Sequence, residues 1–305
     1  MTSSIHTVSS SVKIAYQLHH PATTSNPPRP TIILINGLTD PKESWLSQTP
    51  AFTAAGYTVL IYDNRGIGAS SRPTESGQVY TASDMANDLA SLIRGVGIRG
   101  EVHILGISMG GMITQTFALE HVLPGTIPEI NVLSVTLACT YAAPNTFCTR
   151  MFNYWSHVAQ KLNLATVMQD LALWCFTPAF FDSASGKEVL AEYDAEVAKI
   201  DDVAQGGMGI PAYLAQMNVI LKFDSRKQLK GLADRIGKGG PEVIVLVGEN
   251  DILIPVPLSR ELHELIPGSK WQTTKGGHAC NWEEVDAFNQ ICLDTWKVVE
   301  GRRRS

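Results

Sequence analysis

Residues 102–112 read VHILGISMGGM, and the five residues from Gly106 to Gly110 fit the pattern Gly-x-Ser-x-Gly. VHILGI is largely apolar, as in a strand buried on both faces, and the residues after Ser108 have helical periodicity. A strand that turns at once into a helix strains the residue at the bend and needs small neighbours around it. The stretch therefore predicts that Ser108 is a nucleophile, although a serine within a glycine-rich bend would also fit these residues.

A serine hydroxyl is a weak nucleophile and needs a base, usually a histidine that a carboxylate orients. His278 follows the last expected strand, in KGGHACNW, while the other histidines are interpreted as surface or core residues. Asp251, in VGENDILIP, ends a buried strand, where catalytic groups of open α/β sheets collect. Asp224, in KFDSR, is the second candidate for the acid. We expect Ser108, Asp251 and His278 to act together.

The flanking sequence predicts an α/β fold with a mostly parallel sheet covered by helices on both faces. The expected strands are apolar or alternating runs at 11–18, 31–36, 58–63, 102–107, 132–138, 242–248 and 269–275. The expected helices of this core lie at 44–55, 82–95, 109–121, 257–266 and 282–299. Ser83 and Asp84 are expected to cap the second of these helices.

The strand and helix alternation stops between residues 139 and 242. Helical patterns rich in aromatic residues and methionine replace it, at 146–162, 164–176, 186–200 and 211–222. We expect a helical cap at 141–224, inserted into a core formed by 1–140 and 225–305. Most of its aromatic residues should pack the cap onto the core, and a minority should line a pocket. The candidates for substrate binding are Trp155, Trp174, Met208 and Tyr213.

The composition suits a globular protein that acts on small molecules. The chain has 305 residues, 44% of them hydrophobic and 17% charged, with a net charge of −5. These values do not suggest a nucleic-acid partner, and no apolar run is long enough for a membrane span. Five scattered cysteines and the lack of a signal-peptide pattern predict a cytoplasmic protein with reduced thiols. A homodimer is compatible with the sequence.

Five motifs together resemble the α/β-hydrolase superfamily, in its capped, single-chain type. The resemblance covers about 1–140 and 225–300. The motifs are INGLTD (35–40), DNRGIGAS (63–70), GISMGG (106–111), VGENDILIP (247–255) and GGHACNWE (276–283). They are specific for the fold and for a catalytic triad, and weak on substrate.

The resemblance also implies an oxyanion hole. Its donors would be the backbone N–H groups of Leu38 and Met109. Asn36 stands where many members of the superfamily have histidine, so a role of this side chain in shaping the loop or contacting substrate is open. Asp63 and Arg65 are expected to pair with each other in a structural turn. The implied chemistry needs no cofactor and no metal.

Three functions remain open at this point. The first is hydrolysis of an ester or lactone of a medium-sized, largely apolar substrate through an acyl-enzyme. The second is cleavage of a C–C bond in a diketone with the same triad, and perhydrolysis is a side activity of similar proteins. The third is a ligand-binding protein that keeps the pocket without turnover, against which the complete triad argues.

Overall fold

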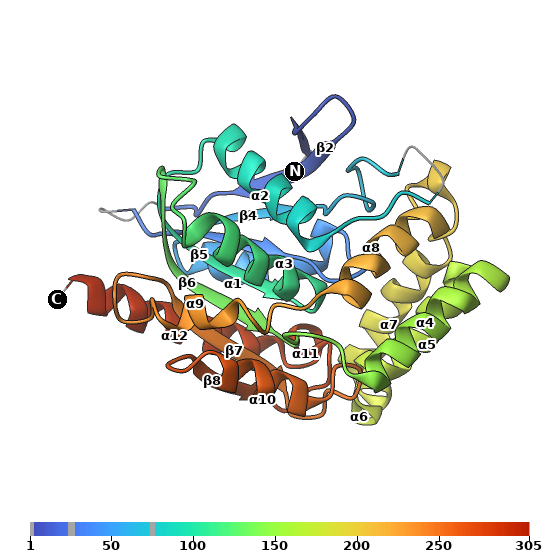
Figure 1. Ribbon diagram of the computed structural model, residues 1–305. Helices are drawn as coiled ribbons and strands as arrows, with labels where there is room; N and C mark the ends of the chain where they lie inside the picture. The colour runs from blue at the N-terminus through green and yellow to red at the C-terminus, as the bar shows by residue number, and fades with distance from the viewer. Residues whose placement is uncertain (1–2, 24–27, 74–76, 305) are drawn as a thin grey trace.

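The computed structural model describes residues 3–23, 28–73 and 77–304, and it is built around one twisted sheet (Figure 1). Within these residues the sheet has eight strands in the order β1-β2-β4-β3-β5-β6-β7-β8, in which β2 alone runs antiparallel to the others. The strands are β1 (Ser4–Thr7), β2 (Lys13–His19), β3 (Thr31–Ile35), β4 (Thr58–Tyr62), β5 (Gly100–Ile107), β6 (Ile130–Ala138), β7 (Glu242–Gly248) and β8 (Lys270–Thr274). The predicted α/β class is confirmed.

The central strands are buried on both faces. Every residue of β7 from Val243 to Gly248 is buried, as are the last six residues of β5. A continuous apolar run is what such a position requires, and this is why the sequence pattern identified these strands. The edge strand β1 was not predicted, because its four residues are mostly exposed and carry no apolar run.

Helices cover both faces of the sheet (Figure 1). On one face α1 (Gln48–Ala54) and α12 (Val285–Arg304) pack against the sheet and each other, with the rings of Phe52 and Trp296 4.9 Å apart. The other face carries α2 (Ala82–Val96), α3 (Met109–Phe117) and α10 (Val256–Leu265). Shorter elements of the core are the 3-10 turn Lys42–Trp45, the π turn Ala118–Val122, α9 (Leu229–Ala233) and α11 (Cys280–Glu283). The sheet therefore lies between two apolar layers.

A block of helices is inserted between β6 and β7, on the right of the view in Figure 1. It contains α4 (Thr146–Lys161), α5 (Leu164–Cys175), α6 (Pro178–Asp182), α7 (Ala184–Val197), a 3-10 turn (Val203–Gln205) and α8 (Ile210–Lys222). The two ends of the block meet, since the Ser225 N–H donates to the Ala142 carbonyl over 2.9 Å. The block thus leaves and rejoins the core at one place.

Several predicted boundaries were wrong in detail. The helix expected at 44–55 is a 3-10 turn followed by α1, and the helix expected at 282–299 is α11 followed by α12. Helix α2 begins two residues earlier than a cap at Ser83 would place it, although Asp84 does take part in the cap. Its cap is Thr81, whose side chain accepts the Asp84 N–H while the Asp84 carboxylate accepts the Thr81 N–H. This reciprocal pair satisfies two N–H groups that a helix start leaves open.

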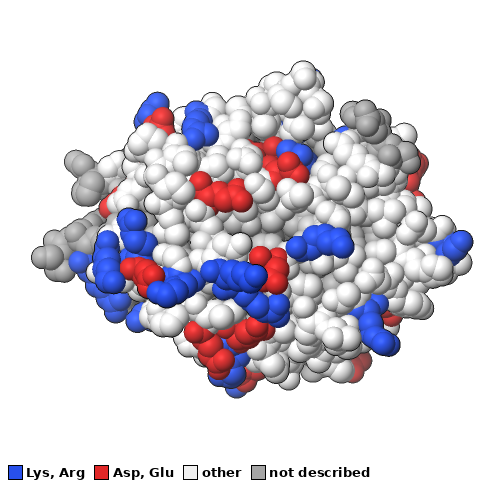
Figure 2. All heavy atoms as spheres, viewed as in Figure 1, with Lys and Arg blue, Asp and Glu red and all other residues white. Residues whose placement is uncertain are grey.

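On the face shown in Figure 2, acidic and basic side chains lie in small mixed groups, with several basic side chains close together on the left, and a large area is uncharged. Among the described residues, none of the helices combines the length and the apolar character that crossing a membrane would require.

Candidate active site

Ser108 lies at the sharp turn between β5 and α3. Its backbone has φ 55° and ψ −119°, a left-handed conformation that is rare for a residue other than glycine. The turn is held because the Ser108 N–H donates to the Ala138 carbonyl over 2.9 Å, and the Ser108 carbonyl accepts from Gly111 N–H and Thr140 Oγ1. Strain of this kind persists only when its surroundings fix it, and it is found at functional sites.

The two glycines of the motif are sterically required. A Cβ on Gly106 would collide with the Gly110 carbonyl, and a Cβ on Gly110 would collide with the Ile35 carbonyl. Helix α3 can therefore start close to the sheet only with glycine at both positions. The close approach points the first N–H groups of α3 and the Ser108 side chain toward the carboxyl ends of the strands.

Asp251 and His278 form a buried acid and imidazole pair. The His278 Nδ1–H donates to Asp251 Oδ2 over 2.8 Å, and Asp251 Oδ1 accepts the Ile254 N–H over 2.9 Å. Both carboxylate oxygens thus have a donor, and the ring's other nitrogen remains for a proton transfer. Asp224 instead lies near Arg226, whose guanidinium is 3.5 Å from its carboxylate.

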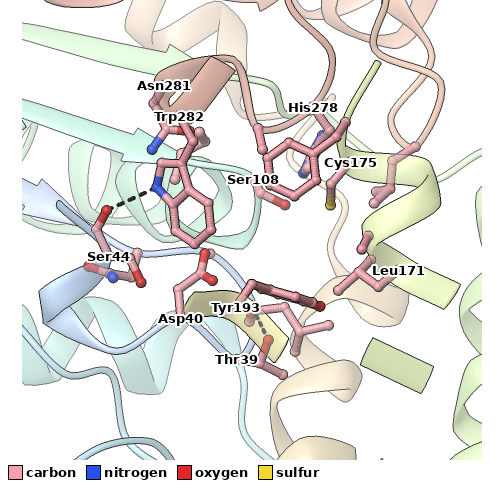
Figure 3. Close-up of a pocket in the computed structure, with 18 of the residues that line it drawn as sticks. Thr39, Asp40, Ser44, Ser108, Leu171, Cys175, Tyr193, His278, Asn281 and Trp282 are labelled. Atoms are coloured by element: carbon pink, nitrogen blue, oxygen red, sulfur yellow. Dashed lines mark hydrogen bonds between the residues drawn. The ribbon is translucent and has the colours of Figure 1, made fainter. Parts of the chain in front are cut away.

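One pocket contains both Ser108 and His278 (Figure 3). Its floor is formed by the loop after β3 and by the turn at Ser108. Its far wall is formed by the inserted helices. Most of the lining side chains are apolar, and those of the inserted helices are Phe152, Trp155, Leu171, Ala172, Cys175, Phe176, Tyr193 and Ile220. A pocket of this character accepts a largely apolar group and places it against Ser108.

One of the two expected oxyanion donors lines this pocket, and the other follows Ser108 in the chain. Leu38 lies in its lining, in the loop after β3, and Met109 is the first residue of α3. The first N–H groups of a helix have no partner within the helix, and the helix dipole adds positive potential there. The arrangement is one that can stabilise an oxygen anion formed beside Ser108.

Asn36 shapes the loop that carries Leu38. Its side-chain amide donates to the Pro41 carbonyl, and its Oδ1 accepts from Trp45 Nε1 over 2.6 Å. Asn36 also lines the pocket, but its polar atoms are used inside the loop. The structure therefore favours a loop-shaping role over direct contact with substrate for this side chain.

The expected pairing of Asp63 with Arg65 was wrong. The buried Asp63 carboxylate accepts from Lys42 Nζ at 3.0 Å and from the backbone N–H groups of Lys42 and Ala69. Arg65 binds both oxygens of Asp88 in α2 at 2.6 Å. The turn at Gly66 directs the two side chains toward different partners, and Asp63 ties the start of the 3-10 turn to the end of β4.

Gln216 of α8 connects the inserted helices to the loop after β3 that carries Leu38, called the oxyanion loop below (residues 36–40). Its Oε1 accepts the Thr39 N–H over 3.2 Å, and its Nε2 donates to the Arg65 carbonyl over 2.9 Å. Gln216 is fully buried, and Thr39 has a positive φ of 63°. A strained residue next to Leu38 is thus held by a side chain about 180 residues away in the sequence.

We expect Gln216→Leu to lower kcat roughly 10-fold with little change in KM on an activated ester. The substitution removes both hydrogen bonds at similar volume and releases Thr39, so the Leu38 N–H moves away from the position that an oxyanion would occupy. The matched control is Asn218→Leu in the same helix, whose amide donates to the Tyr80 carbonyl over 2.9 Å. It should lower the melting temperature while keeping kcat. Equal kcat losses in the two variants would contradict a specific role for Gln216.

The four cap residues expected to bind substrate are placed differently from one another. Trp155 lines the pocket, with its Nε1 donating to Asp170 Oδ2. Trp174 packs behind it, 6.3 Å from the Trp155 ring. Met208 and Tyr213 are buried in the apolar core and do not line the pocket. The sequence pattern predicted the helices, but it did not predict which side of each helix faces the pocket.

Sequence reasoning missed the pocket residues Asp40, Tyr193 and Trp282. Asp40 belongs to the INGLTD motif, so an acid in the oxyanion loop was a visible signal. Trp282 belongs to the GGHACNWE motif beside His278, which was a signal too, whereas nothing in the sequence of α7 indicated that Tyr193 would reach the pocket.

A metal ion is a poor fit to the one ligand-like cluster found among the described residues. Cys139 Sγ lies within 4.8 Å of the ligand atoms of Asp251 and His278. The last two are already joined by a direct hydrogen bond, and Cys139 Sγ is 3.5 Å from Cys280 Sγ. The pKa of the Cys139 thiol is raised by its contact with Cys280 and by burial, which disfavours the thiolate that metals bind.

Comparisons with known proteins identify the family and the fold. A family model described as the alpha/beta hydrolase fold matches residues 30–285. A protein of Yersinia enterocolitica named "Putative carbamate hydrolase RutD" is 27% identical over 270 residues, which are 88% of each chain. Among solved structures, a bromoperoxidase from Bacillus anthracis has a TM-score of 0.78 at 21% identity, covering 97% of this chain and all of that chain. An enol-lactonase from Burkholderia xenovorans has a TM-score of 0.76 at 21% identity, covering 93% and 96%.

Proposed function

The chain belongs to the α/β-hydrolase family, and on that premise we propose that it hydrolyses a carboxylic ester or lactone through an acyl-enzyme on Ser108. The observation that carries the proposal is one pocket that holds Ser108, in its strained turn, together with His278, which Asp251 orients. The enzyme class follows from the family. The ester or lactone and the roles of the individual residues are the proposal.

In the proposed mechanism the Ser108 Oγ attacks the substrate carbonyl carbon while His278 Nε2 takes the hydroxyl proton. Asp251 holds the Nδ1–H and stabilises the imidazolium that forms. The N–H groups of Leu38 and Met109 bind the oxyanion, each worth about 3 kcal/mol in comparable sites. His278 then gives its proton to the leaving oxygen, and water releases the acid by the same steps.

We propose that residues 141–224 form a cap over a core made of 1–140 and 225–305. The cap contacts both loops that the mechanism uses. Gln216 binds the oxyanion loop, and the Cys175 carbonyl accepts the Ala279 N–H beside His278 over 3.0 Å. In this proposal Trp155 contacts substrate, while Trp174, Met208 and Tyr213 support the wall. Removing the whole cap would therefore disturb catalysis as well as access, and single substitutions test its role more cleanly.

We also expect the enzyme to work in the cytoplasm on a small molecule without a cofactor. All five cysteines are unpaired, which suits a reducing compartment. The proposed steps use only protein groups and water.

Hydrolysis of a carbamate is the second candidate function. It is favoured by the relative named a putative carbamate hydrolase, which matches this chain over 88% of its length. The same serine would attack a carbamate carbonyl, and the same N–H groups would bind the oxyanion that forms. No feature of the pocket favours cleavage of a C–C bond, which stays an alternative from the sequence.

The decisive experiment is a substrate panel on the purified chain. It contains p-nitrophenyl esters, aliphatic lactones, aryl carbamates and 1,3-diketones, with a fluorophosphonate probe to label an active serine. We expect labelling of Ser108 and turnover of esters or lactones. Turnover confined to diketones would contradict the proposed substrate class, and no turnover with no labelling would contradict the proposed mechanism.

The cap wall should set the preferred acyl length. Leu171 lines the pocket from α5, so Leu171→Ala should raise the kcat/KM ratio of p-nitrophenyl octanoate to acetate roughly 10-fold, because the added space accepts more methylenes. The matched control is Leu173→Ala, two residues along the same helix, where the side chain is 61% exposed. It should leave the ratio unchanged. A ratio that is insensitive to Leu171→Ala would show that α5 does not contact the acyl group.

A further inference from the structure

Among the described residues that line the pocket there is one acidic side chain, Asp40, which the mechanism above does not use. We propose that the Asp40 carboxylate binds an N–H group of the substrate close to the scissile carbonyl. The enzyme would then select esters or related acyl compounds that carry an amide, carbamate or amine N–H. This inference rests on the proposed hydrolase function and names its substrate class.

Asp40 is placed where it can reach a substrate bound at Ser108. A Cβ built on Gly37 would lie 3.0 Å from Asp40 Oδ2 and 3.4 Å from Ser108 Cβ. The carboxylate oxygen is therefore separated from Ser108 Cβ by no more than the sum of these distances. Figure 3 shows the Asp40 side chain rising from its loop into the pocket, between Trp282 and Tyr193. A two- or three-atom substituent on the carbonyl would span this gap.

The charge of Asp40 is poorly compensated by its surroundings. No lysine or arginine is found among the described residues that line the pocket, where His278 is the one group that can become cationic. Lys42, two residues further along the chain, is engaged by Glu43 at 2.8 Å and by Asp63 at 3.0 Å. Removing a carboxylate from water without a partner is costly, so a ligand that supplies a donor gains affinity there.

Three side-chain donors of the pocket are used elsewhere. The Trp282 Nε1–H donates to the Ser44 carbonyl over 3.0 Å, and the Tyr193 hydroxyl donates to the Met168 carbonyl over 2.7 Å. The Thr39 hydroxyl donates to the Leu38 carbonyl. The Gly37 N–H bonds to the Asp40 carboxyl. A substrate N–H could bind the carboxylate without displacing any of these three side-chain donors.

The ionisation of Asp40 is set by the same environment. Burial raises its pKa to about 7, against smaller opposite effects of His278 and of the Gly37 N–H. Cys175 of α5 and Tyr193 of α7 also face it, and burial raises the pKa of each, so both stay neutral near pH 7. An N–H donor prefers the ionised carboxylate. Selectivity for the N–H group should therefore be lost as the pH falls below about 7 and gained as it rises above.

The test compares two p-nitrophenyl esters that differ by NH in place of CH2, those of N-acetyl-β-alanine and of 5-oxohexanoic acid. In the wild type we expect a kcat/KM ratio of roughly 10 or more in favour of the N–H ester, rising with pH through about 7. Both esters are attacked by the same Ser108 with the same proposed base, so effects on these shared steps cancel in the ratio. Asp40→Leu should bring the ratio close to one, and Asp40→Asn, whose amide oxygen still accepts, should lower it; both should remove its pH dependence.

The matched control is Asp224→Asn, an acid outside the pocket, which should keep the wild-type ratio. A third ester, of 4-(trimethylammonio)butyric acid, carries a positive charge without N–H. If the wild type preferred this ester as strongly as the N–H ester, charge attraction would explain the selectivity without a hydrogen bond. That result would overturn the inference. Equal hydrolysis of the first two esters by the wild type overturns the inference alone. Hydrolysis of no ester contradicts the proposed hydrolase function itself.

Discussion

Ser108→Ala should reduce kcat/KM for an activated ester by roughly 10⁴-fold or more and abolish labelling by a fluorophosphonate. The substitution removes only the Oγ atom, which is the attacking atom in the proposed mechanism. Alanine keeps the Cβ, so the strain at φ 55° is the same as for serine and the melting temperature should change little. Rate measurements on folded, purified variants check the prediction.

The control for Ser108→Ala is a second hydroxyl in the same pocket. Ser44 lines the pocket too, but the atom that it contributes to a hydrogen bond is its carbonyl, which accepts from Trp282. Ser44→Ala should keep kcat/KM within about threefold of the wild type, since surface and lining polar groups away from the reacting atoms cost little. If Ser108→Ala retained wild-type turnover, the proposed acyl-enzyme would be excluded.

The fold was predictable where local sequence decides local structure. The strands β5 and β7 are continuous apolar runs because each is buried on both faces, and Gly106 and Gly110 are glycines because a Cβ at either position would collide with backbone. The short edge strand β1 was not visible, because its pairing with β2 is made through backbone atoms and its side chains stay mostly exposed.

The site was predictable where chain order and position after a strand carry the information. Asp251 and His278 lie 27 residues apart and meet because β7 and β8 are neighbours in the sheet. Pairings across the fold could not be read in the same way. Asp63 and Arg65 are neighbours in sequence, yet Arg65 binds Asp88 of α2, and only the packed structure determines that choice.

The pocket wall was the least predictable part for the same reason. Trp155 and Tyr213 both lie in inserted helices, and one lines the pocket while the other does not. Which face of an inserted helix meets the pocket depends on how that helix packs onto its neighbours, and hydrophobic helices have apolar residues on several faces. Gln216 also escaped notice, since a single glutamine in a helix gives no sign of a partner in a distant loop.

Asp251→Asn should lower kcat roughly 10⁴-fold with the fold retained. In one orientation of the new side chain, its Oδ1 still accepts the Ile254 N–H, and its NH₂ group faces His278 Nδ1. The ring must then place its proton on Nε2, which can no longer take a proton from Ser108. In the flipped orientation the NH₂ group opposes the Ile254 N–H, so the first orientation, with its inactive tautomer, is the favoured one.

Asp224→Asn is the control that decides between the two acids considered from the sequence. The Asp224 side chain is 58% exposed and its carboxylate lies 3.5 Å from the Arg226 guanidinium, so its loss should change kcat less than threefold. Steady-state kinetics and a thermal melt of both variants separate catalysis from folding. If kcat fell severely in Asp224→Asn and stayed near the wild-type value in Asp251→Asn, Asp224 would be the acid that orients His278. An equal, mild effect of both would mean that His278 keeps its tautomer without either carboxylate, and the mechanism would then need another group to stabilise the imidazolium.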